Sequence, residues 1–389
     1  MNAPIATARA APGLPALATV LAAAALTLMA AAVIAPALPA MATAYAGTPG
    51  AELLVRLAVG ITSLAIAVSA PLAGALADRV GRASLLTGGL LLYAVSGTAG
   101  WFLTGLPALL GSRILLGIAV GAVMTAVAAT LTDWYEGPRR ALWLGRQQAA
   151  ASLGGVVFLP LAGVLAGIDW RLPFWLHAAA APIAVAAALL LRDGPPAAPN
   201  TPDPVRGQGN TAGILGIYLL ALTATLAFFM APTQLPFLLT EQGAGPAAVG
   251  VIVAGSTLTS IAGALLFPRL RARLTPTAVT AASLALLGLG WLVAGTAAHP
   301  AQVLAGLLIG GLGVGAVVPD LNTRLGELAP PHRRGRVLSG LVTAIFLGQF
   351  LSPVVLAPLV ARIGIEGAFT TTGLALLGAG FLLQKGRKS

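Results

Sequence analysis

The sequence contains no cysteine and few charged residues. Of its 389 residues only 8% are Asp, Glu, Lys or Arg, whereas 58% are hydrophobic. Without cysteine there is no disulfide framework and no thiol nucleophile. So little charge cannot cover a water-soluble globule of this size, and the apolar runs are continuous rather than alternating, which disfavours a membrane β-barrel. The composition therefore indicates a helical membrane protein.

Motifs of membrane enzymes, channels and ATP-driven pumps are also missing from the sequence. It contains no His-Glu-x-x-His, no Gly-x-Ser-x-Gly, no clustered carboxylates, no filter-like loop and no Gly-x-x-x-x-Gly-Lys-Ser/Thr. We therefore expect a protein that is not an enzyme and that needs neither a cofactor nor a metal. A polytopic membrane enzyme or a channel stays open as an alternative.

Apolar segments of membrane-spanning length recur along the whole chain. At about 20 residues per span, twelve are predicted, at 16–38, 54–77, 83–104, 107–131, 141–167, 172–191, 214–239, 247–268, 277–297, 301–321, 337–361 and 366–384. Residues 192–212 are rich in Pro, Gly, Asn and Asp and predict a linker. We therefore expect an all-α membrane protein with two six-helix bundles, at 1–191 and 213–389.

The basic residues gather in alternate loops. If the N-terminus is cytoplasmic, eighteen Lys and Arg lie on the cytoplasmic side, and the four exceptions are Arg56, Arg113, Arg171 and Arg362. This positive-inside bias explains the net charge of +11 without a nucleic-acid partner. We expect a multi-pass protein of the inner (cytoplasmic) membrane with both termini cytoplasmic. A cleaved signal peptide at 1–38 is the alternative, but it would invert every later loop.

A dense charge cluster lies between the second and third predicted spans. The segment Gly74-Ala75-Leu76-Ala77-Asp78-Arg79-Val80-Gly81-Arg82 resembles the signature loop of the major facilitator superfamily. The resemblance implies a latch, formed by Gly74, Asp78, Arg79, Gly81 and Arg82, in which Asp78 faces the start of the eleventh span. Such a latch holds the two halves together in the outward-open state and releases in the inward-open state. The alternative is that these charges only fix the topology.

The two halves of the chain also resemble each other. Gly137-Pro138-Arg139-Arg140 is echoed by Pro331-His332-Arg333-Arg334 at an offset of 194, and Phe174 by Phe369 at an offset of 195. Parallel repeats of six spans are typical of this superfamily, whose substrate site lies between the halves near mid-membrane. The resemblance thus implies a secondary transporter that works by alternating access, and we expect a monomer.

Three titratable residues at membrane depth are candidates for ion coupling. The segment Leu109-x-x-x-Arg113-x-x-Leu116-Gly117 resembles a second motif of the superfamily, with Leu116 replacing the usual glutamine. The resemblance implies that Arg113 serves proton transfer or holds the first span, and snorkelling to the outer interface is the alternative. His177 and Asp320 are the other two candidates, and Asp320 is spaced for an i, i+4 pair with Arg324. We expect protons as the coupling ion.

Small residues in the fifth span resemble an exporter motif. Gly145, Gly154, Pro160 and Gly163 partly match the glycine-rich segment of the superfamily's twelve-span drug/proton antiporters, although Phe158 stands at a glycine position and the proline is displaced by one residue. Small residues also allow close packing in any membrane helix. We therefore predict efflux, with substrate uptake or facilitated sugar efflux as the alternative.

The middle of the predicted spans contains no Asp, Glu or Lys. A cationic substrate would find no counter-ion there, so we expect a neutral or weakly polar organic molecule. The candidate binding residues are Met29, Thr125, Phe228, Phe229, Gln234, Phe346, Gln349 and Phe350. For each aromatic side chain helix packing is the alternative role, whereas an amide in hydrocarbon needs a partner, which favours Gln349.

Overall fold

The computed structural model describes residues 12–193, 211–329 and 334–385, and every regular element in these ranges is a helix. The first half contains α1 (Leu14–Ala32), η1 (Ala35–Ala37), α2 (Leu38–Ala44), α3 (Ala51–Val80), α4 (Arg82–Thr98), η2 (Ala99–Trp101), α5 (Leu106–Trp134), α6 (Gly137–Ala166), η3 (Leu172–Ala179) and α7 (Ala180–Leu190). The second half contains α8 (Thr211–Phe228), α9 (Met230–Glu241), α10 (Pro246–Arg273), α11 (Pro276–Gly295), α12 (Pro300–Leu328) and α13 (Arg334–Lys385).

Twelve membrane spans follow once α13 is divided. Among the described residues, 11 helical segments are long and apolar enough to cross a membrane, and the last of them runs over 49 residues, Val337–Lys385. At about 1.5 Å per residue such a helix would be more than twice as long as the hydrocarbon core is thick. The backbone turns at Gly364 (φ 74°, ψ 174°), where two helices meet. The prediction of twelve spans is therefore confirmed.

The first and seventh spans are broken, which the apolar pattern did not predict. In the first span α1 ends at Ala32 and η1 begins at Ala35, while in the seventh α8 ends at Phe228 and α9 begins at Met230. Both breaks lie just before prolines, Pro36 in the first span and Pro232 in the seventh. Proline lacks the N–H that a continuous helix needs, so the backbone bonds are interrupted there.

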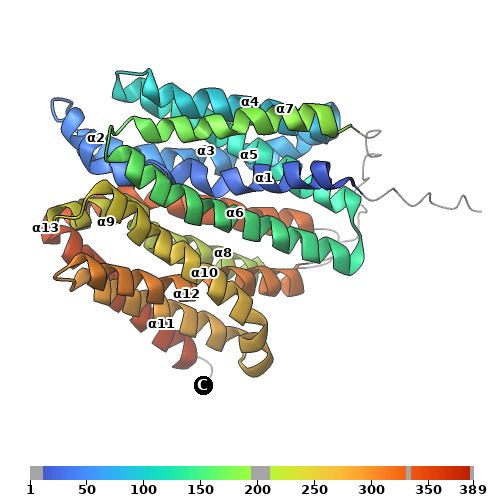
Figure 1. The fold of residues 1–389 in the computed structure, drawn as a ribbon. Helices are drawn as coiled ribbons and strands as arrows, with labels where there is room; N and C mark the ends of the chain where they lie inside the picture. The colour runs from blue at the N-terminus through green and yellow to red at the C-terminus, as the bar shows by residue number, and fades with distance from the viewer. Residues whose placement is uncertain (1–11, 194–210, 330–333, 386–389) are drawn as a thin grey trace, which may run out of the picture.

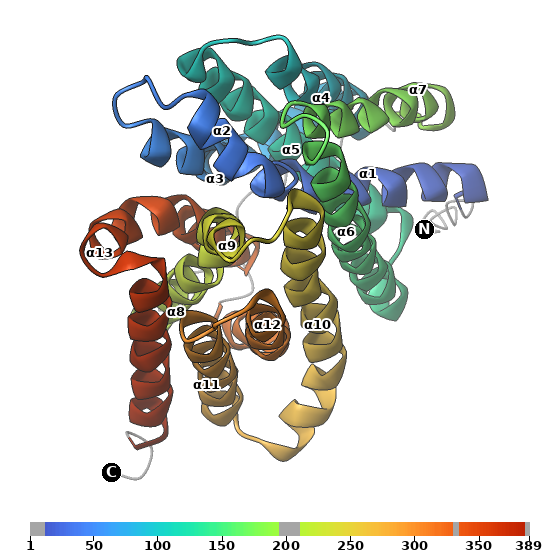
Figure 2. The same ribbon diagram turned by 60° about the vertical axis from the view of Figure 1, so that its left-hand side comes forward.

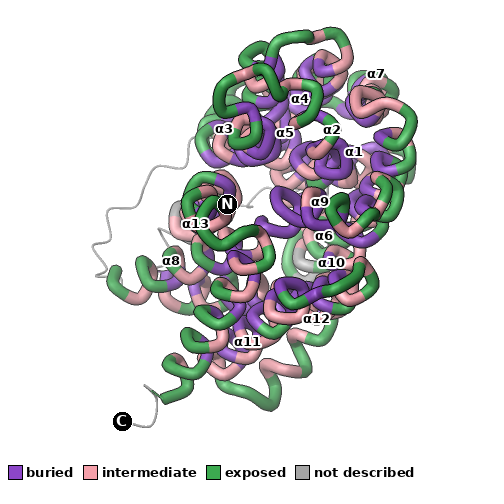
Figure 3. Tube along the Cα trace, turned by 90° about the vertical axis from the view of Figure 1, so that its left-hand side faces the viewer, coloured by how far each residue is buried: buried purple, intermediate pink, exposed green. Residues whose placement is uncertain are grey.

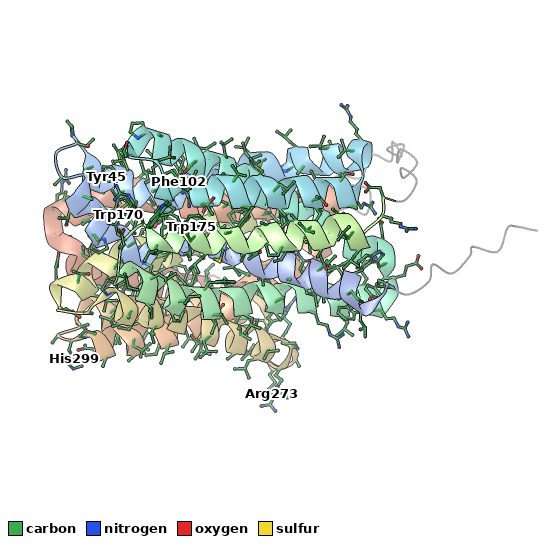
Figure 4. The ribbon with its side chains drawn as sticks, turned by 45° about the horizontal axis from the view of Figure 1, so that its top comes forward. Tyr45, Phe102, Trp170, Trp175, Arg273 and His299 are labelled. Atoms are coloured by element: carbon green, nitrogen blue, oxygen red, sulfur yellow. The ribbon has the colours of Figure 1, made fainter. Side chains whose placement is uncertain are left out.

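The helices form two bundles that lie beside each other (Figures 1 and 2). The turns that carry Arg79, Arg82, Arg271 and Arg273 lie at one end of the spans, here called the arginine-rich end. Figure 4 shows Arg273 far from His299, which marks the opposite end. Aromatic residues gather toward the opposite end, where the rings of Tyr45 and Trp170 are 5.8 Å apart and those of Phe102 and Trp175 are 5.9 Å apart. Such a belt is typical of a membrane–water interface.

Buried side chains fill the inside of each bundle, whereas the outer faces expose apolar side chains (Figure 3). Leu189 on α7 is 76% exposed and Leu265 on α10 is 70% exposed. In water such a surface would be unstable, but hydrocarbon is a suitable solvent for it. The outward apolar faces therefore identify the sides of the protein that contact lipid.

The two bundles touch closely where α6 meets α10. A methyl group added to Gly250 would lie 2.5 Å from the Leu159 carbonyl oxygen and 3.1 Å from the Gly163 Cα. Glycine is therefore needed at both positions for the two backbones to approach. This contact explains Gly163, which the exporter motif had singled out. Gly154, by contrast, packs on the Ala25 carbonyl of α1, and the space next to Gly145 is open among the described residues.

We expect Gly250→Ala to lower the thermal unfolding midpoint of the purified protein, because overpacking at a close helix contact costs about 1–3 kcal/mol. Gly88→Ala on α4 is the matched control, since a methyl there meets no described atom within 4 Å. Alanine favours a helix by about 1 kcal/mol over glycine, so the control variant should be at least as stable as the wild type. Equal midpoints for the two variants would contradict the contact.

Candidate functional site

The contact surface between the two bundles is built by two pairs of helices. The first pair is α6 and α10, and the second is α3 and α13. A methyl group added to Gly60 on α3 would lie 3.3 Å from Pro353 and 3.4 Å from the Phe350 carbonyl on α13. Each pair joins the second span of one half to the fifth span of the other, so the two pairs are equivalent under the internal repeat.

One hydrogen bond between side chains connects α3 to α13. The Ser63 hydroxyl donates to Gln349 Oε1 over 2.8 Å, and Gln349 is half-buried. The residue that the sequence favoured as a polar contact therefore lies at the boundary between the halves. Phe350, the next residue, contributes its backbone to the same contact with Gly60.

Gln234 on α9 is the most unusual polar group in this region. Its side chain is 1% exposed, and neither its amide nitrogen nor its oxygen has a hydrogen-bond partner among the residues that the structure describes. Leaving a buried amide unpaired costs about 1–3 kcal/mol per group. The Gln234 amide therefore retains its hydrogen-bonding capacity among the residues that the structure describes.

The candidate aromatic residues face different surroundings. Phe229 and Phe346 belong to the second half but pack against the hydrophobic core of the first. Phe228 instead stacks on Trp291, with ring centroids 6.4 Å apart, and the Trp291 indole donates to the Ala227 carbonyl over 2.8 Å. Phe229 and Phe346 are thus placed at the boundary of the halves, whereas Phe228 packs within its own half.

Met29 and Thr125 make contacts inside the first half. Met29 is fully buried in its hydrophobic core. Thr125 donates its hydroxyl to the Ala70 carbonyl over 3.3 Å and so connects α5 to α3. Both residues have packing roles within the first half, and among the described residues neither makes a hydrogen bond to Gln234 or Gln349.

Arg113 is fully buried and does not snorkel to an interface. Its Nη2 donates to the Ser96 and Gly97 carbonyls over 3.1 and 2.8 Å, and its Cζ lies 4.9 Å from the centre of the Phe174 ring. These carbonyls end α4, where the helix dipole carries partial negative charge. The carbonyls at the end of α4 and the ring of Phe174 therefore stabilise the Arg113 guanidinium, although its Nε and Nη1 lack a hydrogen-bond partner within the described ranges.

His177 is packed next to this arginine cluster. It is fully buried, its Nδ1 lies 2.9 Å from the Phe174 carbonyl oxygen, and its ring centroid is 5.5 Å from that of Tyr93. Tyr93 in turn donates its hydroxyl to the Leu26 carbonyl of α1 over 2.8 Å. The cluster therefore holds the first span against the interior of its bundle. All of its residues belong to the first half.

Asp320 lies in a polar network near the arginine-rich end of the second half. Its carboxylate accepts a hydrogen bond from Thr280 over 2.7 Å and lies 3.7 Å from Arg271 and 4.0 Å from Arg324. The expected pair with Arg324 is thus present at the limit of an ion pair. Arg271 also contacts Glu327 at 3.0 Å, so the network joins α10, α11 and α12.

The signature loop is held by a residue that the sequence analysis did not single out. The Asp193 carboxylate accepts hydrogen bonds from the Ala83 N–H over 2.7 Å and from the Ser84 hydroxyl over 2.5 Å, which satisfies the start of α4. Gly81 has a φ of 89°, and a methyl group there would overlap the Asp193 carboxylate. Glycine is therefore required at position 81 for both backbone conformation and space.

Among the residues that the structure describes, the other latch residues make no contact with the second half. Arg82 pairs with Asp133 on α5, within its own half, and Arg79 is exposed. A methyl group on Gly74 would meet no described heavy atom within 4 Å. The side chain of Asp78 lies outside the described part of the structure.

Arg56 makes a contact across the halves that sequence reasoning missed. Its Cζ lies 4.3 Å from the centre of the Phe237 ring on α9, and its Nη1 lies 2.7 Å from Glu52. The Arg56 side chain is only 8% exposed. The signal in the sequence was that Arg56 is one of the four exceptions to the positive-inside bias. A cation on the wrong side of the membrane needs shelter, and an aromatic face provides it.

The family model described as Major Facilitator Superfamily matches residues 20–215 and 217–387. The 3-(3-hydroxy-phenyl)propionate transporter of Escherichia coli K12 is 26% identical over 71% of this chain and 69% of its own length. Multidrug resistance protein 1 of Bacillus subtilis is 33% identical over 36% of each chain. The inward-open structure of the xylose transporter XylE from E. coli superposes with a TM-score of 0.79 at 14% identity, covering 95% of both chains, which is a likeness of fold.

We expect Gln234→Leu to raise the thermal unfolding midpoint, because it removes a buried amide without a described partner at a gain of about 1–3 kcal/mol. Gln242→Leu is the matched control, since Gln242 donates to the Ala297 carbonyl over 2.8 Å and its loss should lower the midpoint. Both midpoints are measured on purified protein in detergent without substrate. A lower midpoint for Gln234→Leu would mean that the amide is satisfied within the protein.

Proposed function

Because the chain belongs to the major facilitator superfamily, we propose that this membrane transporter exports small neutral or weakly polar organic molecules in exchange for protons. The observation that carries the proposal is the uncharged polar group at the contact between the halves. Ser63 and Gln349 meet there across 2.8 Å, and the Gln234 amide, which has no partner among the described residues, lies buried on α9. Substrate hydroxyl or carbonyl groups would satisfy such amides.

The absence of acidic residues from the middle of the spans supports the neutral substrate. An isolated cation loses several kcal/mol of hydration in a water-poor site without a counter-ion. Attraction to an aromatic ring offers about 0.5–2 kcal/mol, which is less than that loss. Of the aromatic candidates, Phe229 and Phe346 are the better placed for substrate packing, because both reach the boundary between the halves.

The distribution of contacts supports an inward-open state. Arg56, Gly60 and Ser63 touch the second half from the part of α3 nearer the opposite end, and Leu159 and Gly163 do so from the corresponding part of α6. We place the arginine-rich end in the cytoplasm, as the positive-inside bias requires. The halves 1–191 and 213–389 would then rock about these contacts, connected by the linker 192–212. In the outward-open state Gly74, Asp78 and the arginines beside them would close the cytoplasmic side.

The direction of transport rests on sequence likeness. The partial antiporter motif around Gly154 and Gly163 favours efflux, and one relative is named a multidrug resistance protein. Uptake is the second candidate, favoured by the likeness to a 3-(3-hydroxy-phenyl)propionate transporter that extends over 71% of this chain. We further propose that the protein acts as a monomer in the inner membrane with both termini cytoplasmic.

Among the coupling candidates, Asp320 is the group that a proton can neutralise with the least rearrangement. Its carboxylate is fully buried and shared between Thr280 and two arginines, so protonation would loosen the contacts between α10, α11 and α12. Arg113 and His177 act together in one buried cluster, and we propose that it holds the first span in place during coupling.

We expect a neutral compound to be exported in preference to its quaternary ammonium analogue. Gln349→Ala should reduce export of the neutral compound about tenfold, since a hydrogen bond in a water-poor site contributes about 0.5–1.5 kcal/mol and its partner is left unpaired. The measurement is efflux of the matched pair from cells that lack other exporters. Preferential export of the quaternary compound, unaffected by Gln349→Ala, would refute the proposed site.

We expect uphill export to stop when an uncoupler dissipates the proton gradient. Arg113→Ala and Asp320→Asn should each lose gradient-driven accumulation in inverted vesicles. A variant in which only the coupling is lost should still exchange labelled for unlabelled substrate. Uphill transport that continues with the uncoupler present would show that protons are not the coupling ion.

A further inference from the structure

A long apolar groove runs along the outside of the first half, between α3, α4 and α5, which lie beside each other in Figures 1 and 2. Its volume is about 430 Å³. Eleven of its twelve lining residues are apolar, and Ser69 is the exception. None of its lining residues is among those that make the contacts between the halves described above.

Small residues form the floor of this groove and long ones its rims. A methyl on Gly117 of α5 would overlap the Ala65 side chain and one on Gly121 would overlap the Ser69 hydroxyl, so α3 and α5 touch there. The rims stand out from this contact, with Leu72 exposed by 66% and Ile114 by 42%. The groove is therefore a feature of backbone packing and not of one side-chain rotamer.

The length of the groove suits a lipid chain. Its lining on α3 extends from Ile61 to Leu76, which at about 1.5 Å per residue is roughly 22 Å. One leaflet of the hydrocarbon core is about 15 Å thick. A chain that enters from the arginine-rich end would therefore stay in contact with protein over the whole depth of its leaflet.

The arginine-rich end of the groove carries a free-standing cation. Arg79 follows Leu72 and Leu76 on α3 at the spacing that places residues on one face of a helix, and it is exposed. It makes no ion pair with the side chains that the structure describes, whereas Arg82 pairs with Asp133. Leu85 of α4 lines the same end of the groove. A lipid phosphate at this level would meet Arg79 directly above the acyl chain.

We propose that this groove and Arg79 form a binding site for an anionic phospholipid, with one acyl chain along α3 and the phosphate on Arg79. Each basic residue near an anionic membrane surface contributes about 1 kcal/mol to lipid attraction. The apolar lining accepts any acyl chain, so selectivity arises at the head group. A lipid with net negative charge is preferred because a zwitterionic head group brings its own cation to the arginine.

The test is native mass spectrometry of the full-length, delipidated protein titrated with phosphatidylglycerol or phosphatidylcholine of the same chains. We expect one tightly retained phosphatidylglycerol. Arg79→Gln should weaken its retention about fivefold, which corresponds to the loss of one such charge, and leave phosphatidylcholine unchanged. Arg79→Lys should restore the preference. Val68→Trp should weaken retention of both lipids by filling the groove, whereas Leu189→Trp on the lipid face of α7 should have no effect.

Equal retention of the two lipids by the wild type would overturn the proposal, because it would show ordinary lipid solvation of an apolar face. Unchanged phosphatidylglycerol retention in Arg79→Gln would overturn the head-group contact. A dimer that hides the groove, detected in the same spectra, would overturn it as well. If Val68→Trp fails to fold, Ile118→Trp fills the groove from α5 and takes its place.

Discussion

In hydrocarbon a charged or hydrogen-bonding group is stable only beside a partner, and the side-chain arrangement of this protein follows from that constraint. Three of the four arginines that break the charge bias, Arg56, Arg113 and Arg171, each lie over an aromatic ring, at 4.3, 4.9 and 4.3 Å from its centre. Arg113 adds the carbonyls that end α4. Each cation is thus stabilised locally, without a mid-membrane carboxylate.

Under the same constraint, a buried polar group without a described partner requires an explanation. The amide of Gln234 is buried and unpaired among the described residues, on a helix that begins just after the break at Phe229. Natural proteins seldom keep such a group without a functional reason. Its helix α9 contacts η1, α2 and α3 of the first half, and this position, together with the Ser63–Gln349 bond, is the basis of our proposal that a polar substrate binds between the halves.

Internal repetition organises both the core and the charged end. Phe174 and Phe369 are equivalent in the two halves and both are fully buried. Arg82 pairs with Asp133 in the first half, and Arg271 pairs with Glu327 in the second. Glu327 lies 194 residues after Asp133, at the offset of the internal repeat. Each pair connects the turn after the second span of its bundle to the fourth span. Each tie lies within one half, so each half is connected internally near the arginine-rich end.

The sequence by itself determined that the protein lies in a membrane, how many spans it has, how it divides into halves and to which family it belongs. These properties depend on composition, apolar run length and a local motif. It also singled out Gln349 as a binding candidate and Gly163 as a packing residue, and the structure has both at the contact between the halves. The breaks in the first and seventh spans were not visible, since a broken and a continuous helix have the same apolar pattern.

Only the tertiary structure decided the partners of the polar groups. That Asp193 holds the signature loop, that Arg56 reaches Phe237, and that Phe228 packs within its own half depend on residues far apart in the chain. Periodicity within one helix fixes which residues share a face, but not which helix that face meets. The close approach of helices is set by steric contact between distant glycines and carbonyls, and this information exists only in the folded chain.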